Sequence, residues 1–181
     1  GTGSFSLNRR SGTTIGNFSF AEGSNTTASG TCSHAEGSGT TASAWQSHAE
    51  GDGTTASGTC SHAEGNNTTA SGARSHAEGN GTTASGNYSH AEGNNTTADG
   101  VGSHAEGQET KTGTNYQHVQ GKYNVGKTTT AFEIGNGTSD TARSNAFEVD
   151  WDGNVNIPSG ASYMVNGVPI GAGAGDVKGP G

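Results

Sequence analysis

Large apolar side chains are scarce in this chain. Leucine, isoleucine, valine and phenylalanine together make up about a tenth of the residues, where less than a fifth normally indicates disorder. Between Ala21 and His118, Val101 is the only residue of these four types. A conventional apolar core is therefore excluded for this stretch, which either stays unstructured or folds by another route.

Positive charge and long apolar runs are scarce as well. Eight Lys and Arg stand against 16 Asp and Glu, so the formal net charge is −8. Nucleic acids and anionic membranes need a basic footprint, and a membrane span needs a long apolar run. We therefore expect no nucleic-acid partner and no membrane insertion.

Histidine, in contrast, recurs with a strict period of 14 residues. The seven histidines are His34, His48, His62, His76, His90, His104 and His118. One unit reads Ser-His-Ala-Glu-Gly, two variable residues, Thr-Thr-Ala-Ser-Gly and two more variable residues, and eight units run from about residue 11 to residue 125. Disordered chains rarely keep such register, so the period indicates a repeat fold.

Each unit predicts two short strands and two tight turns. The variable pairs are typical of tight turns, as in 66–67 (Asn-Asn) and 80–81 (Asn-Gly), because Asn and Gly tolerate positive φ. Stacking the units pairs each strand in parallel with its copy, which gives a parallel β-solenoid, a rod of roughly 40 Å. Cys32 and Cys60 occupy the same position two units apart, roughly 9 to 10 Å, too far for an intrachain disulfide.

Strand alternation assigns the two faces of each unit. Ala35, Ala28, Ser33 and Thr26, with their copies, are expected to point inward, because only small residues fit inside so narrow a coil. Histidine and glutamate then point outward. Such a thin roll buries little apolar area, so we expect oligomerisation to stabilise it.

The repeat resembles the head repeat of YadA-like trimeric adhesins. That resemblance rests on the Ser-x-Ala-x-Gly frame and the 14-residue spacing, and it implies a left-handed parallel β-roll in which three chains pack about a threefold axis. The family's Val and Ile are His and Glu here, in a form that looks like the versions in phage tail proteins. The resemblance thus implies a polar trimer interface of His34, Glu36, His48, Glu50, His62, Glu64, His76, Glu78, His90, Glu92, His104 and Glu106.

Beyond residue 128 the period ends and denser apolar alternation begins. Strands are predicted at 130–135, 146–151, 154–158 and 162–166, with turns at 152–153 (Asp-Gly) and 166–167 (Asn-Gly), as a small antiparallel unit. The expected organisation is a lead-in at 1–10, an all-β repeat domain at 11–127, a small β domain at 128–170 and a Gly-rich linker at 171–181. Residues 147–155 and 175–180 resemble phage tail-fibre segments.

The repeated chemistry argues for architecture rather than catalysis. Glu36, Glu50, Glu64, Glu78, Glu92 and Glu106 repeat one environment, whereas acid–base catalysis needs two carboxylates in different environments. No catalytic residue and no cofactor is predicted. The seven histidines favour a hydrogen-bonded ladder with Glu or Ser, and a metal site formed by imidazoles of three chains is the alternative. Such a ladder is expected to loosen in acid.

The variable turn after Ala-Ser-Gly is the candidate recognition surface, because it varies on a fixed scaffold. We expect Trp45, Arg74, Tyr88 and Tyr116 to lie along one edge, where they contact a host-surface glycan or protein. The alternative is that they are exposed turn residues or pack on a neighbouring chain. An outward threonine stripe leaves ice binding as a further alternative. The main hypothesis is a homotrimeric rod of a bacteriophage tail fibre or receptor-binding protein in the virion; the alternative is the head of a trimeric autotransporter-type adhesin at the bacterial surface.

Overall fold

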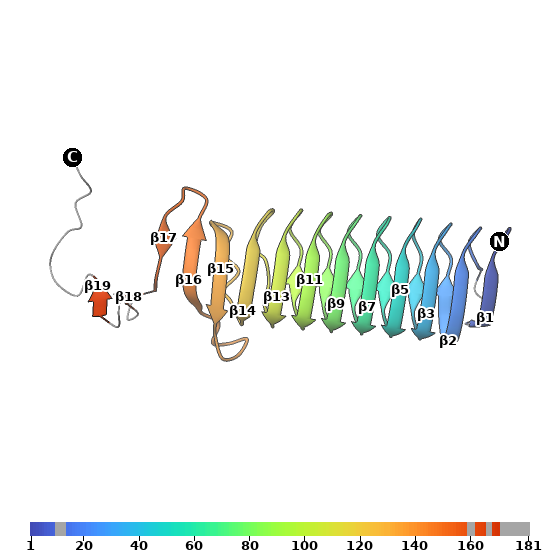
Figure 1. The fold of residues 1–181 in the computed structure, drawn as a ribbon, viewed down its shortest axis with the longest axis horizontal. Helices are drawn as coiled ribbons and strands as arrows, with labels where there is room; N and C mark the ends of the chain where they lie inside the picture. Colours follow the sequence, from blue (N-terminus) through green and yellow to red (C-terminus); the bar gives the residue numbers. More distant parts are fainter. Residues whose placement is uncertain (10–13, 159–161, 166–167, 171–181) are drawn as a thin grey trace.

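The chain folds into a rod of stacked β-strands. The computed structural model describes residues 1–9, 14–158, 162–165 and 168–170. The strands stack one after another along the rod, from the N-terminus at one end to β17 near the other (Figure 1). The all-β parallel solenoid is confirmed. The predicted linker at 171–181 and the Asn-Gly turn at 166–167 lie outside the described residues.

One row of longer strands runs the length of the solenoid. Each strand pairs in parallel with the strand 14 residues further on, so that His48 lies opposite His62 and Ala49 opposite Ala63. The row consists of β2 (Phe20–Ala28), β3 (His34–Ser38), β5 (His48–Asp52), β7 (His62–Asn66), β9 (His76–Asn80), β11 (His90–Asn94), β13 (His104–Gln108) and β14 (His118–Lys122). β1 (Phe5–Arg9), within the predicted lead-in, adds a parallel strand before β2.

A second row of two-residue strands closes each coil. It comprises β4 (Thr41–Ala42), β6 (Thr55–Ala56), β8 (Thr69–Ala70), β10 (Thr83–Ala84) and β12 (Thr97–Ala98). β2 is long enough to enter both rows, since Phe20 pairs with His34 and Thr27 with Thr41. The predicted two-strand coil is therefore present.

Alanine, serine and threonine fill the inside of the coils, as the alternation predicted. The inward alanines from Ala35 to Ala105 are fully buried, and the inward threonines from Thr26 to Thr96 are 0% exposed. The inward serines donate to backbone carbonyls, as in Ser75 Oγ to Gly72 O at 2.7 Å. The core is therefore narrow and partly polar. Most inward serines are paired, whereas within the described residues Ser61 Oγ and the hydroxyls of the inward threonines from Thr26 to Thr96 have no hydrogen-bond partner.

Glycine at the end of Ser-His-Ala-Glu-Gly is required by both conformation and space. Gly79 has φ of 108°, and a Cβ there would lie 2.1 Å from the carbonyl oxygen of Gly93 in the next coil. Any side chain would push neighbouring coils apart, so the glycine permits the close stacking on which the solenoid depends.

The rod ends in antiparallel strands that continue the same sheet. β15 (Thr130–Asn136) pairs in parallel with β14 and antiparallel with β16 (Asn145–Asp150), which pairs with β17 (Val155–Asn156). The predicted strand at 154–158 is shorter because Pro158 cannot donate a ladder hydrogen bond. β18 (Tyr163–Val165) and β19 (Val168–Ile170) form a separate antiparallel pair.

Within these described residues, no helix has the length and apolar character that a membrane span requires.

Candidate functional site

The histidines form one continuous stack on the outer face of the longer strands. Successive rings from His34 to His118 lie with centroids 4.6–4.9 Å apart, and interplanar angles do not exceed 21°. Phenylalanine extends the stack at both ends, with Phe20 5.2 Å from His34 and Phe132 5.3 Å from His118. The strict register of the parallel strands is what aligns these rings.

From Glu36 to Glu106, each glutamate of this face contacts the histidine of the following coil. The Nε2 atoms of His76, His90 and His104 lie 3.2–3.3 Å from the Oε1 atoms of Glu64, Glu78 and Glu92, within hydrogen-bonding geometry. The remaining pairs, His48–Glu36, His62–Glu50 and His118–Glu106, have Nε2–Oε1 distances of 3.3–3.6 Å. We call these two columns, with their extensions at both ends, the His/Glu face. The contacts are those of a ladder within one chain.

A metal ion at these histidines stays the alternative to the hydrogen-bonded ladder. Several groups of two histidines with one glutamate, or two glutamates with one histidine, have potential ligand atoms within 4.8 Å of one another. Within one chain the stacked rings are nearly parallel, so the lone pairs of neighbouring imidazoles point the same way rather than toward a shared centre. A shared ion would therefore need imidazoles from other chains.

The His/Glu face becomes apolar at both ends of the rod. At the first coil, Phe5 and Leu7 lie in register with Phe20 and Glu22, and they are 54% and 55% exposed. At the last coil, Ile134 follows Gln120 in the glutamate column, where an open groove of about 430 Å³ runs from Glu92 to Ile134. Val149 and Val155 extend the apolar end, and Val155 is 59% exposed. Large apolar side chains are thus concentrated on an uncovered face.

The four predicted ligand-contact residues do lie along one edge of the rod. This turn edge consists of the turns at 17–18, 31–32, 45–46, 59–60, 73–74, 87–88, 101–102 and 115–116. Trp45, Tyr88 and Tyr116 are 51%, 59% and 69% exposed. Arg74 donates to the hydroxyl of Tyr88 at 3.0 Å, and its guanidinium lies 5.4 Å from the ring centroid of Tyr88.

A feature that the sequence analysis missed is the backbone of the turn edge. Its second residue has positive φ in every coil, including 57° at Arg74, 60° at Tyr88 and 58° at Tyr116. This left-handed conformation costs a residue other than Gly roughly 1–2 kcal/mol. The cysteines of the same column, Cys32 and Cys60, are free thiols.

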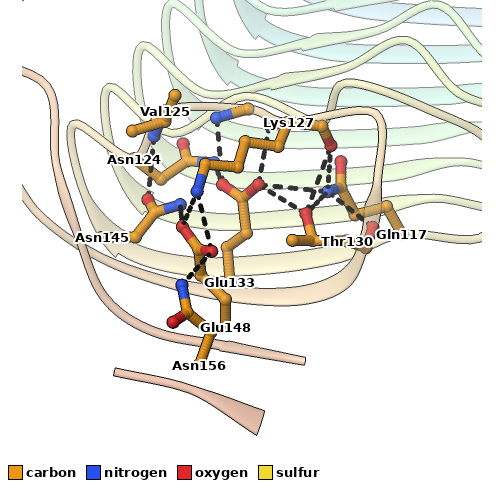
Figure 2. Close-up of polar contacts among 10 residues, drawn as sticks. Gln117, Asn124, Val125, Lys127, Thr130, Glu133, Asn145, Glu148 and Asn156 are labelled. Atoms are coloured by element: carbon orange, nitrogen blue, oxygen red, sulfur yellow. Dashed lines mark hydrogen bonds and ion pairs between the residues drawn. The ribbon is translucent and has the colours of Figure 1, made fainter. Parts of the chain in front are cut away.

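A second missed feature is a buried polar cluster that closes the end of the solenoid (Figure 2). Glu133 lies in register with Val119, so it points inward where the coils have alanine, and it is fully buried. Its carboxylate accepts hydrogen bonds from Asn124 at 2.6 Å, from Thr130 at 2.6 Å, from Gln117 at 3.4 Å and from the backbone N–H groups of residues 126 and 127. We call this cluster, with its neighbour Glu148, the polar cap.

Glu148 forms the outer part of the polar cap. Lys127 Nζ lies 2.6 Å from its Oε1, and the side-chain amides of Asn145 and Asn156 donate to it at 2.8 and 3.0 Å. Burial raises the pKa of Glu148, but these hydrogen bonds and the Lys127 charge outweigh burial and hold it below its ordinary value. Nearby, hydrogen bonds from the side chain and backbone of Asn154 lower the pKa of Asp150. The carboxylates of the cap are thus paired with hydrogen-bond donors, and Glu148 also with the Lys127 ammonium group.

The repeats match a known protein family. Residues 49–75, 63–89 and 77–103 match the family model of the YadA head domain repeat. Residues 49–103 are thus similar to YadA head domain repeats, and they form the central coils of the β-solenoid described above. Such repeats are structural and adhesive, and they are typical of trimeric adhesins. A comparison with curated proteins finds no match.

Proposed function

We propose that this chain is part of a homotrimeric adhesive rod in which the His/Glu face of each protomer packs against two further copies. The repeat is of a type found in surface adhesins, which supports an extracellular location. Attachment to another cell surface is then the function, and the repeats act as scaffold and binding surface rather than as catalysts.

The observation that carries this proposal is the change of the His/Glu face from polar to apolar at both ends. Phe5 and Leu7 at one end and Ile134 and Val155 at the other leave large apolar side chains uncovered in a single chain. Contiguous apolar surface of this kind marks an interface. In the middle, histidine and glutamate already pair within the chain, which reduces the cost of covering them with a partner.

A matched pair of variants tests the trimer. We expect the double substitution Phe5→Asp with Leu7→Asp to lower the solution mass toward that of one chain, because it places charges in the proposed interface. Phe18→Asp is the control, since Phe18 is 66% exposed but lies on the turn edge. Equal masses for the two variants would contradict the assignment of the His/Glu face.

The head of a bacterial trimeric adhesin is the assignment that the family match supports best. A bacteriophage tail fibre is the second candidate. What favours it is His and Glu in place of the family's Val and Ile, together with the resemblance of residues 147–155 to tail-fibre segments. Labelled protein separates the two: an adhesin head is expected to bind animal cells or matrix proteins, and a tail fibre to bind bacterial cells.

A further inference from the structure

We propose that the turn edge is a binding ridge for neutral carbohydrate chains, with the exposed aromatic rings stacking on sugar rings along the rod. This inference rests on the proposed adhesive function and names the ligand class and the surface. The turns on the opposite side of the coils provide an internal comparison.

The two edges of the rod share one backbone conformation but carry different residues. On the opposite edge, which we call the Asn/Gly edge, the positive-φ position is mostly Gly or Asn, such as Gly53, Asn67 and Gly81. These are the residues that this conformation favours. The turn edge instead holds Phe18, Cys32, Gln46, Cys60, Arg74, Tyr88 and Tyr116 at the equivalent position. Stability alone would select Gly or Asn on both edges, so the turn edge keeps its side chains for another reason.

The side chains of the two edges also differ in how they are used. Along the Asn/Gly edge they bond to one another from coil to coil, as Asn80 Nδ2 does to Asn66 Oδ1 at 2.9 Å. Along the turn edge Arg74 and Tyr88 also bond from coil to coil, but the rings of Phe18 and Tyr116 lie back on the coil before them. A Cβ on Gly102 would come within 2.9 Å of the Tyr116 ring, and a Cβ on Gly3 within 2.9 Å of the Phe18 ring. Both aromatic residues remain more than 60% exposed, so the upper face of each ring is open.

The shape of the turn edge fits a linear polymer. Tyr88 and Tyr116 are two coils apart, roughly 10 Å at strand spacing, and the turn between them is Val101-Gly102, so no large side chain separates the rings. A folded protein partner needs a broad patch of roughly 800 Å², which a ridge of separate rings does not supply. A carbohydrate chain can lie along the ridge, with its C–H faces on the rings and its hydroxyls near polar side chains such as those of Gln46 and Arg74.

Charge indicates that the carbohydrate is neutral. The chain has a formal net charge of −8, and Arg74 is the only Lys or Arg in the turns of this edge. The Arg74 guanidinium donates a hydrogen bond to the Tyr88 hydroxyl and lies near the Tyr88 ring, so it is not an isolated positive charge on this edge. A polyanionic glycan would therefore meet net repulsion along the rod. In a trimer the ridge is present three times, which raises the avidity for a polymeric ligand.

The test is an array of neutral oligosaccharides printed beside sialylated and sulfated counterparts, followed by titration of the best neutral binder. The variant is Tyr88→Gly with Tyr116→Gly, since Gly102 already occupies this column. The control is Asn67→Gly at the equivalent position of the Asn/Gly edge. We expect wild type and control to bind neutral glycans, and the double variant to bind at least roughly tenfold more weakly.

A second readout separates recognition from a structural role. Because glycine relieves the left-handed strain, the double variant is expected to melt at the same temperature as wild type or higher, and to keep its solution mass. No neutral binding by wild type, or equal binding by variant and wild type, would overturn the inference. So would a fall in mass of the variant, which would place the turn edge between chains. If the protein is a monomer and still binds neutral glycans through these tyrosines, the trimer proposal is wrong and the carbohydrate-binding inference holds.

Discussion

The coils and the polar cap use the same two faces of one sheet with opposite chemistry. In the coils, small Ala, Ser and Thr point inward, and paired histidine and glutamate point outward. In β15 and β16 the inward positions hold Glu133 and Glu148, and the outward positions hold Phe132, Ile134 and Phe147. The interior is therefore filled by small side chains in the coils and by a hydrogen-bonded polar cluster in the cap, and the large apolar side chains lie on the outer face, where other chains can cover them.

The largest effect is expected from removing the hydrogen-bond acceptor at the centre of the polar cap, the Glu133 carboxylate. Glu133→Ala is expected to lower the free energy of unfolding by about 3–5 kcal/mol, because it leaves several buried donors without a partner. Urea denaturation measures the effect. Glu92→Ala is the matched control, since the Glu92 side chain is 34% exposed in the single chain and its Oε1 lies 3.3 Å from His104 Nε2. Similar losses for both variants would mean that cap and coil glutamates are equivalent.

A smaller effect is expected from overfilling the coil. Ala77 is 0% exposed between Ala63 and Ala91 of the adjacent coils, so Ala77→Leu has no space for its added carbons. We expect a loss of about 1–3 kcal/mol in thermal or urea denaturation. Ser85→Leu, at an exposed position of the same coil, is expected to be nearly neutral. A tolerated Ala77→Leu would show that the coil interior is not close-packed.

The smallest expected effect is on the pH dependence of stability, to which the polar cap contributes through Glu148. Because the folded pKa of Glu148 lies below its ordinary value, its contribution to stability is present above pH 4.5 and is lost as the pH falls through the folded pKa. Wild type is therefore expected to exceed Glu148→Gln in stability at pH 7, and the difference should shrink below pH 4. Both proteins keep the same histidine ladder, so the difference isolates the cap. A difference that stays constant with pH would contradict this assignment.

The coils could be predicted from the sequence because the residues of each 14-residue unit determine both its strand faces and its pairing register. Alternation within Ser-His-Ala-Glu-Gly assigns the faces, and the 14-residue period assigns the register, so Ala35 and His34 were placed correctly. The strand at Phe5–Arg9 lacks such a unit and was missed, although Phe5 and Leu7 alternate as a strand does.

The polar cap could not be predicted in the same way. The unit at residues 117–121 looks like a decayed repeat, because Gln117 replaces serine and Val119 replaces alanine. The role of Gln117 depends on Glu133, which lies 16 residues further on and outside the period. Likewise, local rules assign positive φ to Gly and Asn, so nothing in the sequence marks Tyr88 or Tyr116 as left-handed. In both places long-range stacking overrides local preference.

Solution mass by light scattering tests the central claim, that three copies share the His/Glu face, most directly. At pH 7.5 we expect three times the chain mass of 17.9 kDa. Repeating the measurement with a chelator assigns any metal contribution. A stable monomer with a cooperative melt at pH 7.5 would contradict the account.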